Sequence, residues 1–142
     1  MTMVGNTSGV DIAEEIVKLN DQYENALFGL VNLVQPGYFK NKTSRAGDYY
    51  GIFQNGELVA AAGERMKMDY FTEVSAIVTH PAHTGKGYAK QLTAHVINKI
   101  SDQHKLPYLH VAESNTVAIG MYRKLGFKIR RKISFWNMIT LE

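Results

Sequence analysis

One segment in the middle of the chain, a strand followed by a glycine loop and a helix, constrains the fold most. The strand is expected over residues 71–79 and ends at His80-Pro81. The loop Thr84-Gly85-Lys86-Gly87 then opens a helix, and Pro107 precedes a further strand at residues 108–111. The apolar residues that share one face of this helix are Ala89, Leu92, Val96 and Ile100. A strand–helix–strand crossover of this kind is typical of a mixed α/β sheet.

The flanking segments add further strands and helices. Asn55-Gly56 is a strong hairpin signal between strands expected at residues 49–54 and 57–66. Residues 15–19 are either a short first strand or part of a helix from Asp11, and periodicity leaves both open. The other expected elements are a helix from an N-cap at Asp21 to about Val34, a helix capped by Asn115 and closed by Gly126, and one long final strand from Phe127 to Leu141. The predicted fold class is α/β (α+β), with a central mixed, mostly antiparallel sheet flanked by helices.

Length and composition exclude several classes of protein. The chain has 142 residues, the size of one domain, and we expect residues 1–10 to be a disordered tail and residues 11–142 a single domain. It contains no cysteine, which excludes a disulfide scaffold, a thiolate zinc site, an iron–sulfur cluster and a cysteine nucleophile. No apolar run is long enough to span a membrane, and the first residues lack the apolar core of a signal peptide. The predicted location is therefore the cytoplasm.

Charge is divided unevenly along the chain. Residues 80–132 hold ten Lys/Arg and two Asp/Glu, whereas the other residues hold six Lys/Arg and eleven Asp/Glu. This division suggests a site that meets an anion on one side and a cation on the other, although most single charges need only solvate the surface. The basic half lacks the interleaved aromatic residues of a nucleic-acid platform. His80 and His83 have no acidic or sulfur partner beside them, so we expect no metal site.

Two motifs indicate the chemistry. Backbone N–H groups of the glycine loop can converge on an anion at the positive end of the helix, but the spacing excludes a Walker loop and a dinucleotide fingerprint. The run Val78–Ala89 resembles the acyl-CoA-binding signature of the GNAT superfamily of N-acetyltransferases, a Val-x-x-Pro strand end followed by [Arg/Gln]-x-x-Gly-x-[Gly/Ala]. The run Asn115–Phe127 resembles the same superfamily's Asn-x-x-Ala-x-x-x-Tyr-x-x-x-Gly-Phe helix. The resemblance extends over residues 14–142 and implies a GNAT-like fold.

The resemblance implies a binding site for acetyl-CoA as co-substrate, without a metal. The positions that it assigns to the cofactor are Ile77, Val78, Thr79, Thr84, Gly85, Lys86, Gly87, Tyr88, Ala89 and Asn115. The loop amides would bind the pyrophosphate, and the backbone at residues 77–79 would pair with the pantetheine arm. Thr84 stands where the superfamily usually has Arg or Gln, so a charged contact with the pyrophosphate is lost. We expect Lys86 or Lys90 to replace that contact.

The resemblance also assigns catalytic roles. Tyr122 would protonate the departing thiolate, and the N–H of Ile77 would donate to the thioester oxygen. Glu73 lies at the spacing from Thr84 that superfamily members with a glutamate base show, and a base there would take the proton of the amine. Glu64, on the preceding strand, is the competing candidate.

The function predicted from these residues is transfer of an acetyl group from acetyl-CoA to a primary amine by direct attack. The acceptor is expected to be a small molecule or a peptide, with neither nucleic acid nor a membrane as partner. Whether the chain forms a homodimer stays open. The alternative is a non-catalytic CoA-binding module with a regulatory or interaction role.

Overall fold

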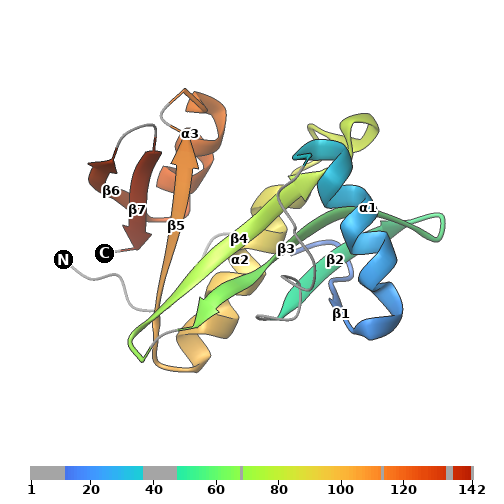
Figure 1. Cartoon of the computed structure of the whole chain (residues 1–142), viewed down its shortest axis with the longest axis horizontal. Coiled ribbons are helices and arrows are strands. Elements are labelled where there is room, and N and C mark those ends of the chain that lie inside the picture. The colour runs from blue at the N-terminus through green and yellow to red at the C-terminus, as the bar shows by residue number, and fades with distance from the viewer. Residues whose placement is uncertain (1–11, 37–47, 68, 113, 134–135, 142) are drawn as a thin grey trace.

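One mixed sheet with helices on both faces makes up the molecule (Figure 1). The computed structural model describes residues 12–36, 48–67, 69–112, 114–133 and 136–141. In chain order the elements are β1 (Val17–Leu19), the 3₁₀ turn η1 (Asp21–Tyr23), α1 (Glu24–Val34), β2 (Tyr49–Gln54), β3 (Glu57–Lys67), β4 (Phe71–Thr79), the 3₁₀ turn η3 (Pro81–His83), α2 (Tyr88–Asp102), β5 (Leu106–Ala112), α3 (Thr116–Lys124), β6 (Phe127–Ile133) and β7 (Trp136–Leu141).

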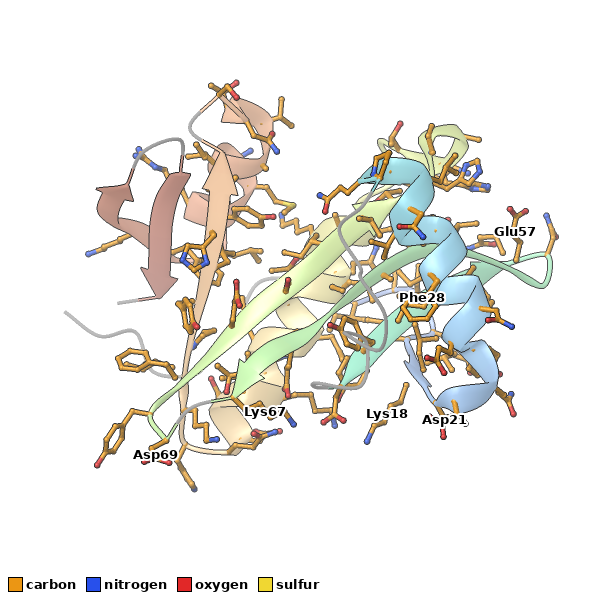
Figure 2. The ribbon with its side chains drawn as sticks, in the orientation of Figure 1. Lys18, Asp21, Phe28, Glu57, Lys67 and Asp69 are labelled. Carbon is orange, nitrogen blue, oxygen red and sulfur yellow. The ribbon has the colours of Figure 1, made fainter. Side chains whose placement is uncertain are left out.

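The sheet has seven strands in the order β1-β2-β3-β4-β5-β7-β6. The β4/β5 pair is parallel, and every other neighbouring pair is antiparallel. The predicted fold class is therefore confirmed. The β3 strand runs from Glu57, at the right of the view, to Lys67, in its lower centre (Figure 2). Among the described residues, no helix is long and apolar enough to cross a membrane.

The two faces of the sheet carry separate apolar clusters. The α1-face cluster packs Leu27, Leu30 and Val31 of α1 against Tyr49, Leu58, Ala61 and Val78 of the sheet. The larger α2-face cluster joins α2 and α3 to the other face and includes Leu92, Ile97, Tyr122, Leu109 and Phe127. Burial of these apolar side chains is the main stabilising term of such a fold. The helices thus hold the strand ends, where the functional candidates lie, in a fixed relation.

The hairpin predicted at Asn55-Gly56 is confirmed. Both residues have positive φ, 53° and 79°, as the tight two-residue turns of β-hairpins require. Along β2, Tyr50 and Ile52 belong to the α2-face cluster, whereas Tyr49 belongs to the α1-face cluster. This alternation is the period-2 pattern of a strand that is covered on both faces.

The structure corrects two local predictions and decides a third that was open. Asp21 does not cap the first helix: Asn20, whose side chain accepts from Gln22 N, caps the turn η1 that Asp21 begins, and α1 follows Tyr23, which makes no side-chain cap. Pro107 does not precede β5 but is its second residue, a strand end where a proline is tolerated. The segment at residues 15–19, left open from periodicity, contains the strand β1.

The prediction of one long final strand is wrong. Residues 127–141 form two antiparallel strands, β6 and β7, and β7 lies between β5 and β6. The sequence there has no glycine, proline or Asn-Gly pair to indicate a turn. Since β7 pairs along both of its edges, two ladders of backbone hydrogen bonds stabilise the hairpin without turn residues of high propensity.

A bulge in β4 changes which face its side chains occupy. Gly63 of β3 pairs with Ser75, but Ala61 pairs with Val78, so three steps along β4 match two along β3. Val74 therefore belongs to the α2-face cluster and Val78 to the α1-face cluster, although residues four apart in a regular strand share a face. The bulge lies at residues 76–77, beside a predicted cofactor position.

Gly63 offers a test of the packing on the α1 face. A Cβ at Gly63 would fall on the ring of Tyr49, which is only 2% exposed. We expect Gly63→Ala to lower the free energy of unfolding by about 1–3 kcal/mol, the usual cost of overpacking. Urea titration measures this change.

Gly29, on the exposed side of α1, provides the matched control. A Cβ there meets no atom within 4 Å. We expect Gly29→Ala to raise stability by roughly 0.5–1 kcal/mol, because alanine is the better helix former. Equal effects of the two substitutions would contradict the packing described for Tyr49.

Candidate functional site

The β4 and β5 strands separate soon after they meet, which opens the sheet at its centre. Their pairing covers only Phe71–Glu73 against Leu106–Tyr108, although β4 continues to Thr79 and β5 to Ala112. Figure 1 shows the two ribbons diverging, β4 toward the loop before α2 and β5 toward α3. Within the described strands, the second half of β4 thus has a neighbour on its β3 side but none on its β5 side. Backbone groups at such an unpaired edge can pair with an extended ligand.

The glycine loop forms the end of this opening. Gly85 and Gly87 have φ of 79° and 78°, values that side chains disfavour, so glycine is needed at both. Gly87 is the N-cap of α2 and provides no side-chain hydrogen bond to the first turn. The N–H groups at the start of α2 are therefore not capped by a side chain of Gly87. They form the positive end of the helix dipole.

A cavity of about 260 Å³ lies at this loop. It is lined by Thr79, His83, Thr84, Gly85, Gly87, Tyr88, Ala89, Lys90 and Met121. Six of the predicted cofactor positions, Thr79, Thr84, Gly85, Gly87, Tyr88 and Ala89, thus come together around one space. Of the two lysines expected to replace a loop-head cation, the structure places Lys90 at the cavity, whereas the exposed Lys86 is not among the lining residues.

A hydrogen-bonded support lies beside the loop. Gln91 Oε1 accepts from the N–H groups of Ala13 and Glu14 at 2.9 and 3.0 Å. Gln54 Nε2 donates to Glu14 Oε1 and to the Tyr88 hydroxyl at 3.2 and 3.0 Å. These contacts connect the N-terminal segment, β2 and the first turn of α2, and they restrict the position of the turn that carries the loop amides.

Ile77, Val78 and Thr79 occupy the second half of β4. The Ile77 side chain packs against the α2-face cluster, the Val78 side chain is buried in the α1-face cluster, and Thr79 lines the cavity. All three lie beyond Glu73, the last β4 residue that pairs with β5. Pairing of their backbone with an extended pantetheine arm requires this placement. That these residues bind the arm stays a prediction.

Tyr122 lies on the α2 face. Its side chain is 7% exposed within the α2-face cluster, and its ring centroid is 6.0 Å from that of Phe127. Burial raises the pKa of Tyr122 to about 12, because the phenolate would lose its hydration. The hydroxyl is therefore protonated at neutral pH, as a proton donor must be. Asn115 accepts from Ala118 N at 3.2 Å, which confirms its predicted capping role.

Glu73 lies on the other face, in contact with a residue that the sequence analysis missed. Its Oε2 is 3.0 Å from Nδ1 of His110. Glu73 pairs in register with Tyr108, and His110 follows two residues later on the same side of β5. The Glu73 side chain is 9% exposed and that of His110 is 35% exposed, so the imidazole is the outer member of the pair. A carboxylate and an imidazole in contact are a common acid–base arrangement.

Glu64, the competing base, lies on the α2 face. It pairs in register with Val74, a member of the α2-face cluster, and it is fully buried. Its Oε2 is 3.1 Å from Lys67 Nζ, an ion pair without well-directed hydrogen-bond geometry, and its Oε1 has no hydrogen-bond partner among the described residues. Burial lowers the pKa of Lys67, but the carboxylates of Glu64 and Asp48 outweigh it and leave that pKa raised. Glu64 and Glu73 thus occupy opposite faces of the sheet.

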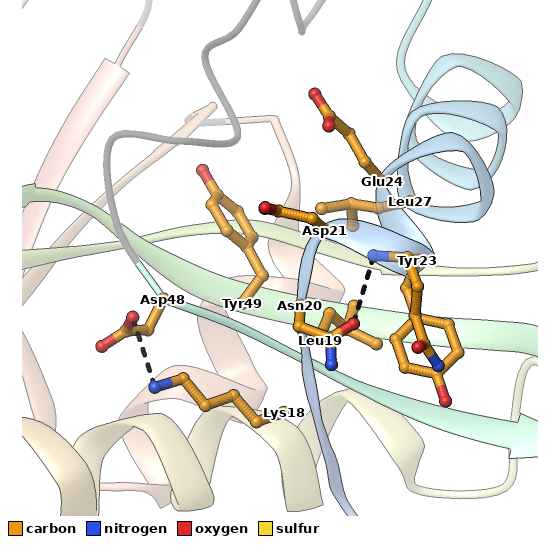
Figure 3. A pocket seen from close by; sticks show the side chains of 10 residues that line it. Lys18, Leu19, Asn20, Asp21, Tyr23, Glu24, Leu27, Asp48 and Tyr49 are labelled. Carbon is orange, nitrogen blue, oxygen red and sulfur yellow. Dashed lines mark hydrogen bonds and ion pairs between the residues drawn. The ribbon is translucent and has the colours of Figure 1, made fainter.

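A second, larger cavity of about 710 Å³ lies between the start of α1 and the start of β2 (Figure 3). Its charged lining residues are Lys18, Asp21, Glu24 and Asp48, with Tyr49 and Leu27 among the others. Lys18 Nζ and Asp48 Oδ1 are 3.7 Å apart. No motif in the sequence indicates this cavity, because its residues come from two separate segments that only the fold brings together.

Comparisons with known proteins agree with this geometry. The family model described as FR47-like protein matches residues 49–136. A protein from Novosphingobium aromaticivorans, described as an acetyltransferase from the GNAT family, is 32% identical, with a TM-score of 0.79 over 94% of this chain and 60% of its own. This chain thus spans about 60% of that protein. A comparison with curated protein sequences finds no significant match.

Two more distant structures share the fold. Arabidopsis thaliana Naa50, solved with the bisubstrate analogue CoA-Ac-MVNAL, is 19% identical, with a TM-score of 0.80 over 91% of this chain and 97% of its own. A GNAT family acetyltransferase from Elizabethkingia anophelis, solved with acetyl-CoA bound, is 17% identical, with a TM-score of 0.78 over 90% and 97% of the two chains.

Gly87 allows a test of anion binding by the loop. Asp and Asn both tolerate positive φ and both cap helices, so either should preserve the fold. Only Gly87→Asp places a negative charge beside the loop amides. We expect Gly87→Asp to abolish stabilisation of the protein by acetyl-CoA in a thermal-shift assay and Gly87→Asn to reduce it less. Equal responses of the two variants would argue against an anion at this loop.

Proposed function

Because the chain belongs to the FR47-like family and to the GNAT superfamily, we propose that it is an N-acyltransferase that transfers an acetyl group from acetyl-CoA to a primary amine. The observation that carries the proposal is the separation of β4 from β5 after Glu73, with the loop cavity at the end of β4. An unpaired strand edge beside a cluster of backbone amides suits an extended ligand that ends in a pyrophosphate.

Acetyl-CoA would lie along the second half of β4. In this proposal its pyrophosphate accepts hydrogen bonds from the N–H groups of residues 85–89, and its pantetheine arm pairs with the backbone of residues 77–79. Asn115 at the start of α3 is proposed to contact the arm from the β5 side. No metal takes part in the proposed reaction.

The proposed reaction uses groups from both faces of the sheet. The proposed reaction forms a C–N bond as the amine attacks the thioester carbonyl, and it breaks the C–S bond. The N–H of Ile77 donates to the oxygen that becomes negative. Tyr122, on the α2 face, gives its proton to the leaving sulfur, and the amine approaches from the α1 face, where Glu73 and His110 lie.

We assign the proton of the amine to the pair of Glu73 and His110. With Nδ1 of His110 donating to Glu73 Oε2, the second ring nitrogen, Nε2, is left to accept a proton. The exposure of the two side chains supports His110 as the group that accepts the proton, because an incoming amine meets the outer imidazole before it meets Glu73. Glu73 then acts as a positioning residue that fixes the ring and stabilises its charged form.

The acceptor proposed is a peptide or protein amine, with a small-molecule amine as the alternative. Naa50 was solved with an analogue that joins CoA to a peptide, and another protein of this fold, from Escherichia coli, is named as the ribosomal-protein-S18-alanine N-acetyltransferase. Two exposed aromatic side chains lie at or just before the start of β4, the strand that carries Glu73. Phe71 is 39% exposed and contacts Tyr108 edge-to-face, and Tyr70 is 76% exposed. The cytoplasmic location and the homodimer stay predictions.

Tyr122→Phe tests the proposed acid. Phenylalanine keeps the ring and its contact with Phe127, so stability should change little. The loss of the proton donor should lower kcat by about 10²–10⁴-fold, the usual contribution of general acid catalysis, while acetyl-CoA affinity stays near the wild-type value. Release of free thiol with a panel of peptide amines measures kcat. A wild-type kcat in this variant would assign Tyr122 to packing alone.

A pair of substitutions tests the base. We expect His110→Gln to lower kcat by about 10²-fold or more and to remove the acidic limb of the pH–rate profile. Glu73→Gln should lower kcat and shift this limb to lower pH, because the protonated imidazole loses the carboxylate that stabilises it. A shift of the limb to higher pH would contradict the assignment.

Glu64→Gln is the control for the base assignment. Since Glu64 lies on the opposite face, we expect this substitution to change stability without moving the pH–rate profile. Loss of activity in Glu64→Gln with full activity in Glu73→Gln and His110→Gln would overturn the assignment. Absence of thiol release with every amine, together with tight acetyl-CoA binding, would favour a non-catalytic CoA-binding module.

A further inference from the structure

The loop before α2 lacks the Arg or Gln side chain that its motif usually has. The residue at this position is Thr84, which is exposed and whose hydroxyl donates to the carbonyl of Pro81 at 3.4 Å. Thr84 therefore adds no charge to the site. A pyrophosphate bound there would need its countercharge from another part of the fold, since charge-assisted hydrogen bonds are the stronger ones.

Two other side chains that carry or can gain a positive charge line the same cavity. His83 lies in the turn η3 and Lys90 in the first turn of α2. No acidic side chain is found among the described lining residues. The nearest alternative, Lys86, is exposed and lies outside this lining.

The surroundings of His83 leave one of its ring nitrogens without a partner among the described residues. This nitrogen, Nδ1, is buried. The neighbouring His80 ring, with its centroid 5.7 Å away, uses its own Nδ1 to accept from Ala82 N. The Tyr88 hydroxyl accepts from Gln54. A buried polar atom without a partner is costly, and a phosphate oxygen would provide one for a protonated imidazole.

We propose that protonated His83, together with Lys90, supplies the positive charge that Thr84 lacks and binds the pyrophosphate of acyl-CoA. This inference rests on the proposed function. Its consequence is a pH-dependent cofactor affinity. Imidazole is charged below its ordinary pKa of about 6.5 and neutral above it, so affinity is high at acidic pH and falls as the pH rises, while Lys90 contributes at every pH in this range.

Calorimetric titration of the full chain with dephospho-CoA tests the proposal. This probe keeps the pyrophosphate but lacks the 3′-phosphate, whose own titration near pH 6 would obscure the result. For the wild type we expect Kd to rise by about ten- to a hundredfold between pH 5.5 and pH 8.5, the size of one hydrogen bond to a charged group. His83→Gln should show one Kd across this range, close to the wild-type value at pH 8.5.

Two further variants complete the design. Lys86→Ala removes a cation from the same loop but outside the cavity, and it should keep the pH dependence of the wild type. Thr84→Arg added to His83→Gln should restore tight binding at both pH values, since arginine stays charged throughout. A wild-type pH dependence in His83→Gln would overturn the proposal.

A second measurement covers the case in which His83→Gln does not fold. The imidazole pKa of His83, followed by NMR in the wild type, should rise when dephospho-CoA binds, because the bound anion stabilises the charged ring. An unchanged pKa with the probe bound would overturn the inference and leave the proposed function intact. Failure of the wild type to bind dephospho-CoA, CoA and acetyl-CoA would overturn both.

Discussion

The short pairing between β4 and β5 is the constraint on which the rest of the site depends. The two strands pair over three residues each and then separate, so the sheet is continuous at one end and open at the other. A continuous sheet keeps side chains of its two faces apart, because the backbone lies between them. In the proposed reaction, the opening is where Tyr122, on the α2 face, and the Glu73–His110 pair, on the α1 face, approach the same ligand. Without it, these groups would belong to separate surfaces.

Several parts of the fold hold the opening in place. On one side, β3 pairs with β4 along its length, and the bulge at residues 76–77 lets that pairing continue past the separation. On the other side, β5 is paired along its outer edge by β7, which is paired in turn by β6. The α2-face cluster joins α2 to residues of both β4 and β5, such as Val74 and Leu109. Backbone groups left without a strand partner are costly unless water or a ligand satisfies them, which makes the open half of β4 suited to a ligand that binds as an added strand.

Local signals predicted most of the fold, and non-local ones account for what was missed. The Asn55-Gly56 hairpin, the glycine loop and the Asn115 cap each depend on a few adjacent residues, and all three are confirmed. The β7 strand was missed because its stability comes from pairing with β5 and β6, which no local pattern encodes. His110 was missed for a related reason. It lies outside both motifs, and only the parallel register of Glu73 with Tyr108 brings it to the carboxylate. Asn20 and Asp21 are both good capping residues, so composition alone could not separate them.

The two glutamates show how placement decides chemistry for identical side chains. A general base must receive a proton from a substrate and later release it to solvent. Glu64 is fully buried on the α2 face, and its contact is Lys67, whose side chain is 34% exposed. Glu73 is also largely buried, and its contact is His110, whose ring is 35% exposed. An imidazole has a second nitrogen that can pass the proton outward, whereas the Lys67 ammonium has no acceptor site. Under the proposed function, only the pair on the α1 face therefore provides a route for the proton from the amine to water, and the register of β4 with β5 is what creates it.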